Sequence, residues 1–120
     1  MRHIKKEQLP TVLSLGKTIE QWLGVTYKEG QPSINWLRID KEKNGKFSVT
    51  HFNVFDDGND ESFDIYRFEA VNLDEPFGET SSFDFYDDAL NFCYKKYLAS
   101  EDKFVMVGVI QEEYRDFKAM

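Results

Sequence analysis

The stretch from Ile34 to Val71 alternates apolar and polar residues and predicts three antiparallel strands joined by two polar turns. Asn44-Gly45 separates the first two runs, and both residues tolerate the positive φ that a two-residue type I′ turn requires at its central positions. Such a turn sets Lys43 opposite Lys46 and fixes the register of the first hairpin.

This register assigns the strand side chains to two faces. It pairs Asn35 with Val54, Trp36 with Asn53, Leu37 with Phe52, Arg38 with His51 and Ile39 with Thr50. Because side chains alternate along a strand, one face carries Leu37, Ile39, Phe52 and Val54, and the other carries Ile34, Trp36, Phe47, Val49, His51 and Phe55. Both faces are largely apolar, so both are expected to be covered.

The polar run from Asp56 to Ser62 predicts the second turn. A four-residue turn over Asp57–Asp60 leads into a third strand and pairs Val54 with Phe63, Phe52 with Ile65 and Val49 with Phe68. Asp57, Asn59 and Glu61 occupy alternate positions in this run, a spacing of oxygen ligands that is also typical of a calcium loop. However, Ser62 and Phe68 stand where that loop needs Gly and a bidentate Glu. We therefore expect a solvated acidic turn and no metal.

Two other segments have helical periodicity. Apolar residues recur at helical spacing over Leu9–Leu23, with Pro10 in the first turn and Gly24 as the expected end. A second wide apolar stripe covers Phe85–Leu98. Charges that complement the helix dipole flank this second helix: Asp84, Asp87 and Asp88 at its start, and Lys95 and Lys96 near its end.

The C-terminal part predicts one more strand. Phe104–Ile110 is apolar without alternation, which favours a strand covered on both faces, and the charged run that follows either leaves the core or turns into a helix. The expected fold is a single α+β domain over residues 1–120 in the order α-β-β-β-α-β. It has a three-strand antiparallel meander, a C-terminal strand placed centrally or at an edge, and two helices. Either one helix covers each face, or one face is left for a second copy of the chain.

Composition limits the class of protein. The chain has 120 residues and 14.1 kDa, with 41% hydrophobic and 16% aromatic residues, enough for one folded core. The single cysteine, Cys93, cannot form an internal disulfide, so a reducing compartment, the cytoplasm, is expected. The chain has no apolar run near the roughly 20 residues of a membrane span, and we expect neither a signal peptide nor an anchor.

The net charge of the chain is −7, and the charged residues are distributed unevenly along it. Residues 1–55 hold nine Lys/Arg and five Asp/Glu, whereas residues 56–120 hold six Lys/Arg and seventeen Asp/Glu. A strong negative field repels nucleic-acid backbones and attracts basic partners, so we expect a basic protein partner and no direct nucleic-acid binding. The simpler interpretation is that the charge serves solubility alone.

Residues suited to catalysis are few. His51 is the one histidine on a predicted strand, and we expect it to pack against a ring such as Trp36 or Tyr66. Cys93 lies on the apolar side of a predicted helix with no base beside it, so we expect a structural role. One cysteine and two histidines give no zinc spacing, and no glycine loop would hold a phosphate. No catalytic residue, cofactor or metal is predicted.

Two hypotheses about function remain, one based on acidic residues beside aromatic ones in the loops and one based on the sheet face. The first is a small acidic protein that blocks a basic partner, in the manner of immunity proteins, antitoxins or phage-encoded inhibitors. Its candidate contact residues are Asp56, Asp57, Asp60, Glu61, Glu75, Phe77 and Glu79. The loop rings Phe77 and Phe83 either anchor the long connection over residues 72–83, which is the favoured interpretation, or offer contacts to a partner. The alternative is a small-ligand binder or enzyme with a pocket on the sheet face, formed by Trp36, Arg38, His51 and Tyr66.

Overall fold

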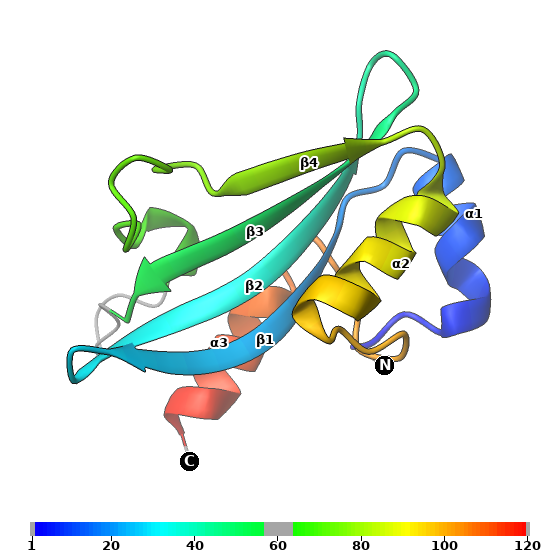
Figure 1. Ribbon diagram of the computed structural model, residues 1–120. Helices are drawn as coiled ribbons and strands as arrows, with labels where there is room; N and C mark the ends of the chain where they lie inside the picture. The colour runs from blue at the N-terminus through cyan, green and yellow to red at the C-terminus, as the bar shows by residue number, and fades with distance from the viewer. Residues whose placement is uncertain (1, 57–63, 120) are drawn as a thin grey trace.

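A five-stranded antiparallel sheet organises the chain in a computed structural model that describes residues 2–56 and 64–119 (Figure 1). The spatial order of the strands is β4-β3-β2-β1-β5. Their bounds are β1 Ile19–Lys28, β2 Gln31–Lys41, β3 Phe47–Phe55, β4 Glu79–Phe83 and β5 Val105–Met106. The helices are α1 Leu9–Ser14, α2 Tyr86–Tyr97 and α3 Ile110–Lys118, with short 3-10 turns η1 Lys6–Gln8 and η2 Ile65–Arg67. The predicted α+β class with an antiparallel sheet is confirmed.

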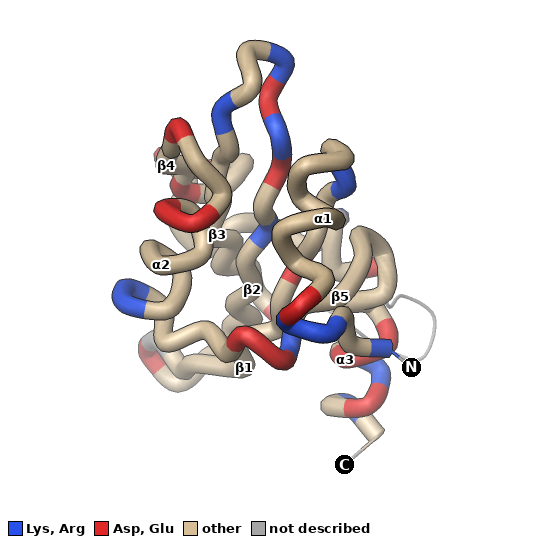
Figure 2. Tube along the Cα trace, turned by 90° about the vertical axis from the view of Figure 1, so that its right-hand side faces the viewer, with Lys and Arg blue, Asp and Glu red and all other residues tan. Residues whose placement is uncertain are grey.

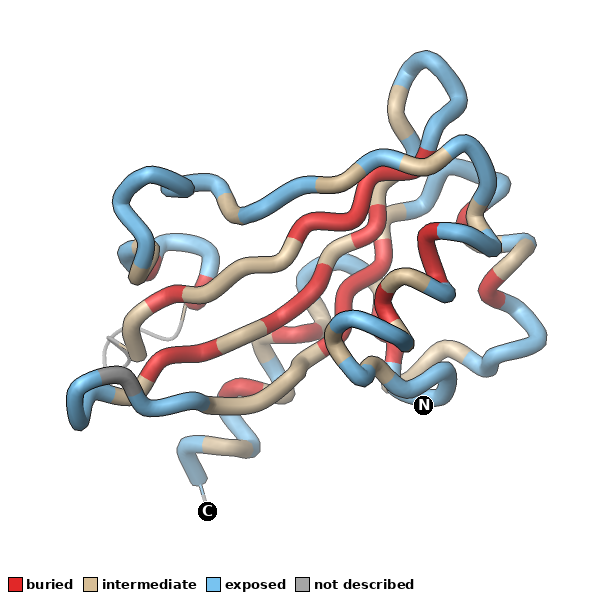
Figure 3. The backbone as a smooth tube through the Cα atoms, viewed as in Figure 1, coloured by how far each residue is buried: buried red, intermediate tan, exposed pale blue. Residues whose placement is uncertain are grey.

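Helices cover both faces of the sheet. On one face, α1 and α2 pack on a cluster that includes Leu37, Ile39 and Val49. On the other face, α3 and the η2 segment pack on a cluster that includes Trp36 and Val54. Figure 3 shows buried residues along β2 and β3 and mostly exposed residues along β4, which forms an edge of the sheet. Both apolar faces are therefore covered within one chain.

The first predicted helix is wrong beyond its second turn. α1 begins at Leu9 as expected, but it ends at Ser14 and Gly16 follows with a φ of +82°. Ile19–Lys28 is a strand, β1. A register shift between Trp22 and Gly24 interrupts the alternation of β1, and this irregularity gave Ile19, Trp22 and Leu23 a spacing that resembles a helix.

The predicted register of the β2–β3 hairpin is wrong by one residue. Glu42 N donates to Lys46 O at 2.7 Å, which leaves a three-residue loop with positive φ at Gly45 but not at Asn44. Observed pairs are therefore Trp36–Phe52, Leu37–His51 and Arg38–Thr50. Because a one-residue slip turns every side chain over, Phe52 and Val54 lie on the face of Trp36, and Val49 and His51 lie on the face of Leu37.

A two-residue turn does occur, but earlier in the chain, between β1 and β2. Glu29 and Gly30 both have positive φ, 53° and 82°, and they join β1 directly to β2. This is the backbone pattern of a type I′ hairpin turn.

The third strand of the predicted meander is misplaced. The expected turn over residues 57–60 and the expected pair of Val54 with Phe63 lie outside the described residues. Ile65 belongs to η2 and Phe68 follows it, so neither pairs with β3 as predicted. Residues 69–71 do lie beside the end of β3, where Val54 bridges Ala70, but the strand that pairs with the rest of β3 is β4, which sets Ser81 opposite Val49. Ile65 and Phe68 instead pack onto the face of the sheet that carries Val54.

The C-terminal segment also differs from its prediction. Only Val105 and Met106 form a strand, at the edge of the sheet beside β1, and α3 starts at Ile110. Gly108, with a φ of +92°, lies between these two elements. The second predicted helix is confirmed as α2, which buries Ala89, Leu90 and Cys93, although Leu98 lies past its end and is exposed.

Candidate functional site

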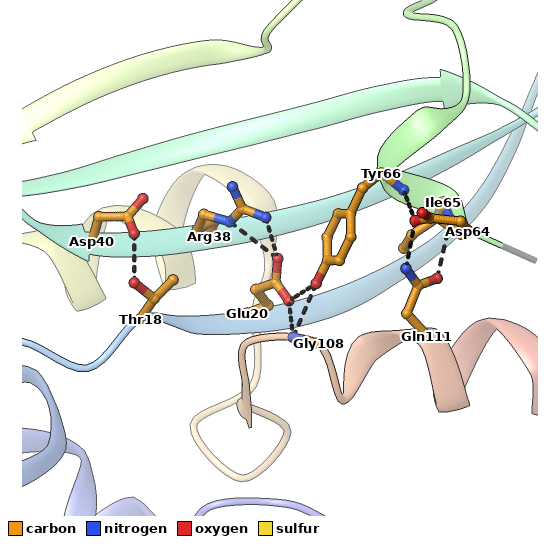
Figure 4. A network of polar contacts seen from close by, with 9 residues as sticks. All are labelled: Thr18, Glu20, Arg38, Asp40, Asp64, Ile65, Tyr66, Gly108 and Gln111. Carbon is orange, nitrogen blue, oxygen red and sulfur yellow. Dashed lines mark hydrogen bonds and ion pairs between the residues drawn. The ribbon is translucent and has the colours of Figure 1, made fainter.

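Glu20 is a fully buried carboxylate where β1, β2, η2 and the turn before α3 meet (Figure 4). Its Oε2 accepts hydrogen bonds from Arg38 Nε at 3.1 Å and from Arg38 Nη2 at 2.9 Å. Its Oε1 accepts from Tyr66 Oη at 2.5 Å and from Gly108 N at 3.1 Å. We call Glu20, Arg38, Tyr66 and Gly108 the Glu20 network. It ties four segments of the chain to one side chain.

The protonation of the Glu20 network follows from its surroundings. Burial lowers the pKa of Arg38, but the hydrogen bond and negative charge of Glu20 outweigh burial and raise that pKa overall. Burial, together with the hydrogen bond to Glu20, raises the pKa of Tyr66 well above its usual value near 10. Arg38 therefore stays charged and Tyr66 keeps its proton, so both remain donors to Glu20.

A cavity of about 230 Å³ adjoins the Glu20 network on the same face of the sheet. The guanidinium carbon of Arg38 lies 5.1 Å from the ring centre of Phe52 and 5.3 Å from that of Tyr66. Trp36 stacks on Phe52 with their ring centres 4.7 Å apart and their planes 14° from parallel. We call this space, lined by Trp36, Arg38, Phe52, Tyr66, Phe68 and Phe77 among others, the aromatic cavity.

Trp36 has an unsatisfied donor in this region. Its side chain is 1% exposed, and its indole Nε1–H has no acceptor among the residues that the structure describes. Leaving a buried donor unpaired typically costs about 1–3 kcal/mol. A ligand that brings an acceptor to this N–H would explain why the donor is left unpaired within the chain.

Three of the four residues in the alternative predicted pocket lie together here, because Trp36, Arg38 and Tyr66 all line the aromatic cavity. The fourth, His51, is on the opposite face of the sheet, where its ring stacks on Tyr97 with centres 4.7 Å apart. Its Nε2 is 3.2 Å from Asn35 Oδ1. The expected pairing of His51 with Arg38 is wrong, since it depended on the incorrect hairpin register.

The position of His51 predicts a loss of stability in mild acid. Burial lowers its pKa, with Lys96 acting in the same direction and Glu79 opposing it. The unfolded chain, with a His pKa near 6.5, thus binds a proton before the folded chain does, so stability falls as pH drops below about 6.5. We expect thermal unfolding of the wild type to move to lower temperature over this range more than that of His51→Gln. Equal pH dependence in the two proteins would contradict this assignment.

Cys93 lies in the core between α2 and the sheet, and its predicted packing is confirmed. Burial raises the pKa of its thiol to about 12, so the reactive thiolate is scarce at neutral pH. We expect no reaction of the native protein with a thiol-specific chromogenic disulfide, and reaction of one thiol per chain after denaturation. Rapid modification of the native protein would show that the thiol becomes accessible without unfolding.

The second candidate surface is an acidic one. Between residues 68 and 94 the chain has seven Asp/Glu and no Lys or Arg. Figure 2 shows negative charge at the N-terminal end of α2 and positive charge near its C-terminal end. Two of these acids are partly neutralised, since Glu79 lies 3.6 Å from Lys96 and Asp84 lies 3.6 Å from Lys46. Asp74 and Glu75 have no ion-pair partner within residues 2–56 and 64–119.

The segment of residues 72–79, here called the acidic loop, has a defined shape. Asp74 N donates to Asn72 Oδ1 at 3.0 Å, Glu75 N donates to Asn72 O at 3.0 Å and Gly78 N donates to Glu75 O at 3.1 Å. Two apolar side chains protrude from it, because Leu73 is 75% exposed and Phe77 is 84% exposed. The expectation that Phe77 anchors the loop is therefore wrong.

The other predicted contact residues are placed differently. Phe83 does pack inward, with its ring centre 4.9 Å from that of Phe92. The carboxylate of Asp56 is 5% exposed, and it accepts from Tyr114 Oη at 2.6 Å and lies 3.3 Å from Lys118 Nζ, so it joins the end of β3 to α3. Asp57, Asp60 and Glu61 lie outside the described residues.

Comparison with known proteins gives no relative: no protein-family model, no curated protein and no solved structure matches the chain. Among the described helices, none is long and apolar enough to cross a membrane. In the same part of the chain, no group of three or more His, Cys, Asp or Glu side chains is placed to hold a metal ion.

Proposed function

We propose that this protein binds a basic partner protein through the acidic loop and thereby blocks that partner, as an immunity protein or antitoxin blocks a toxin. The observation that supports this most directly is the exposure of Leu73 and Phe77 on either side of the unpaired acids Asp74 and Glu75. Exposed aromatic residues supply contact area at protein interfaces, and acidic residues steer a basic partner toward them.

The shape of the loop favours binding without a large ordering cost. Hydrogen bonds within residues 72–78 fix two successive turns, and Val71 N donates to Asn53 O on β3 at 3.0 Å. A loop that already has its bound shape loses less entropy on association than a flexible one. Phe77 is thus presented as an anchor, while Asp74 and Glu75 act at longer range.

The test separates these two roles. The wild-type protein is used to capture its partner from the source cell, and association and dissociation rates are then measured at several salt concentrations. Neutralising Asp74→Asn with Glu75→Gln should slow association and weaken its salt dependence, and adding Asp57→Asn, Asp60→Asn and Glu61→Gln should slow it further. Phe77→Ala should instead raise the dissociation rate by roughly 30-fold or more.

Matched variants on other surfaces control for general effects. Glu101→Gln with Asp102→Asn changes the net charge by the same amount as the loop pair, but these residues lie past the end of α2 and outside the acidic loop. Leu15→Ala removes another exposed apolar side chain, at the end of α1. If these controls alter the rates as much as the loop variants do, or if association is independent of salt, the acidic residues serve solubility and the proposal is wrong.

A further inference from the structure

We propose that the aromatic cavity is a binding site for a small planar aromatic carboxylate. This site is separate from the protein-binding role of the acidic loop, although Phe77 lines its mouth as well as protruding from the loop. Three features of the cavity lead to this ligand class: the donors that it presents, the rings that line it, and its size.

Two side chains that line the cavity, Trp36 and Arg38, carry hydrogen-bond donors without an acceptor in the described part of the chain. Trp36 Nε1–H has no acceptor in the described part of the chain. Arg38 uses Nε and Nη2 on Glu20 Oε2, which leaves its Nη1 without an acceptor among the described residues. The oxygens of Glu20 and Tyr66 are already engaged with each other, with Arg38 and with Gly108. A matching ligand must therefore bring acceptor oxygens of its own.

Arg38 favours a carboxylate over other acceptors. A guanidinium group has five N–H donors in one plane and can bind two carboxylates at once through different edges. Glu20 occupies the edge formed by Nε and Nη2, and it holds the group against the rings of Phe52 and Tyr66. The remaining donors of Arg38 are thus held in a fixed orientation before any ligand arrives.

The lining and the volume define the rest of the ligand. Trp36, Phe52, Tyr66, Phe68 and Phe77 contribute aromatic rings, which bind planar rings by stacking or by edge contacts. A volume of about 230 Å³ corresponds to roughly seven or eight water molecules at about 30 Å³ each. This is room for a single six-membered ring with one carboxylate, and benzoate is therefore a suitable probe.

The indole N–H signals of the protein report directly on this site. The chain has two tryptophans, and Trp22 packs against Tyr114 and Phe117 and does not line the aromatic cavity. In the ¹⁵N-labelled wild type, benzoate should shift the Trp36 indole resonance in a saturable manner and leave that of Trp22 in place. A dissociation constant on the order of 1 mM is expected for a ligand of this size. The Trp36→Phe spectrum assigns the two resonances.

Related compounds and variants test the chemistry. Benzylammonium, which has the ring but a donor in place of the carboxylate, should not shift the Trp36 signal. Trp36→Phe keeps a ring but removes the N–H donor, and it should weaken benzoate binding roughly tenfold in ligand-detected spectra. Asp74→Asn with Glu75→Gln should leave benzoate binding unchanged, so this site and the acidic loop can fail independently.

The main outcomes that overturn the proposal are measured in the wild type, once Trp36→Phe or Trp22→Phe has assigned the two indole signals. If benzoate leaves the Trp36 indole signal unmoved, shifts both indole signals without saturation, or acts no differently from benzylammonium, the cavity holds water only. Binding of benzoate with equal affinity to the wild type and to a folded Trp36→Phe variant would also show that the indole N–H takes no part in binding.

Discussion

Glu20→Ala is expected to lower the free energy of unfolding by about 3–5 kcal/mol. The substitution leaves the buried part of Arg38 without its counter-charge, and it removes the acceptor of Tyr66 Oη and Gly108 N at the same time. Breaking one partner of a buried pair is costly because the other charge remains desolvated. Urea unfolding measures the loss.

Two comparisons separate the stability lost with the polar interactions of Glu20 from the stability lost with its side-chain volume. Glu20→Gln keeps the shape and one acceptor oxygen, so it should cost less than Glu20→Ala. Arg38→Met in the Glu20→Ala background removes the uncompensated charge, so the double variant should be more stable than the sum of the two single losses indicates. Strictly additive losses would mean that Glu20 and Arg38 do not stabilise each other.

The central place of Glu20 in its network could not be predicted from the sequence, because the segment that carries it was assigned to a helix and not to a strand. On a helix over Leu9–Leu23, Glu20 falls between apolar positions and reads as solvent-exposed. On a strand, the same residue lies on the face of Trp22 and opposite Arg38, where a buried ion pair is readily predicted. The signal was present in Ile19-Glu20-Gln21-Trp22, but the bulge after Trp22 hid its two-residue period.

The hairpin error moved His51 into the wrong candidate pocket. Asn-Gly is a strong hairpin signal, but it fits both a two-residue turn and a three-residue loop with Gly in the left-handed region. Here Asn44 instead accepts a hydrogen bond from Lys46 N through its side chain at 2.9 Å. The choice between the two loops shifts the register by one residue, which moved His51 to the opposite face from Trp36 and Tyr66.

Local signals were reliable where no long-range pairing was needed. The limits of α2 follow from an apolar stripe with acids at its start and lysines at its end, and the structure matches this segment closely. The strand beside β3 could not be located in this way. β4 is Glu79-Thr80-Ser81-Ser82-Phe83, a polar edge strand whose partner is determined by the path of residues 64–78 and not by its own pattern.

Gly78→Ala is expected to destabilise the protein by about 2–4 kcal/mol, because two separate costs act at this residue. Its φ of +88° is unfavourable for any residue with a Cβ. In addition, a Cβ at this position would lie 2.8 Å from the backbone oxygen of His51 and 2.8 Å from Thr50 Cγ2. The backbone of β3 cannot move aside without disturbing its pairing with β2, so the clash displaces the acidic loop.

Gly45→Ala is the matched control, because Gly45 has nearly the same φ, +87°, and a Cβ there would meet nothing within 4 Å. It should cost only about 1 kcal/mol, so the difference between the two variants in urea unfolding measures the close approach of the acidic loop to β3. Gly78→Ala should also weaken partner binding in the fraction that remains folded, whereas Gly45→Ala should not. Equal losses of stability would mean that residues 50–52 yield to the added methyl group, and that Gly78 is needed only for its backbone conformation.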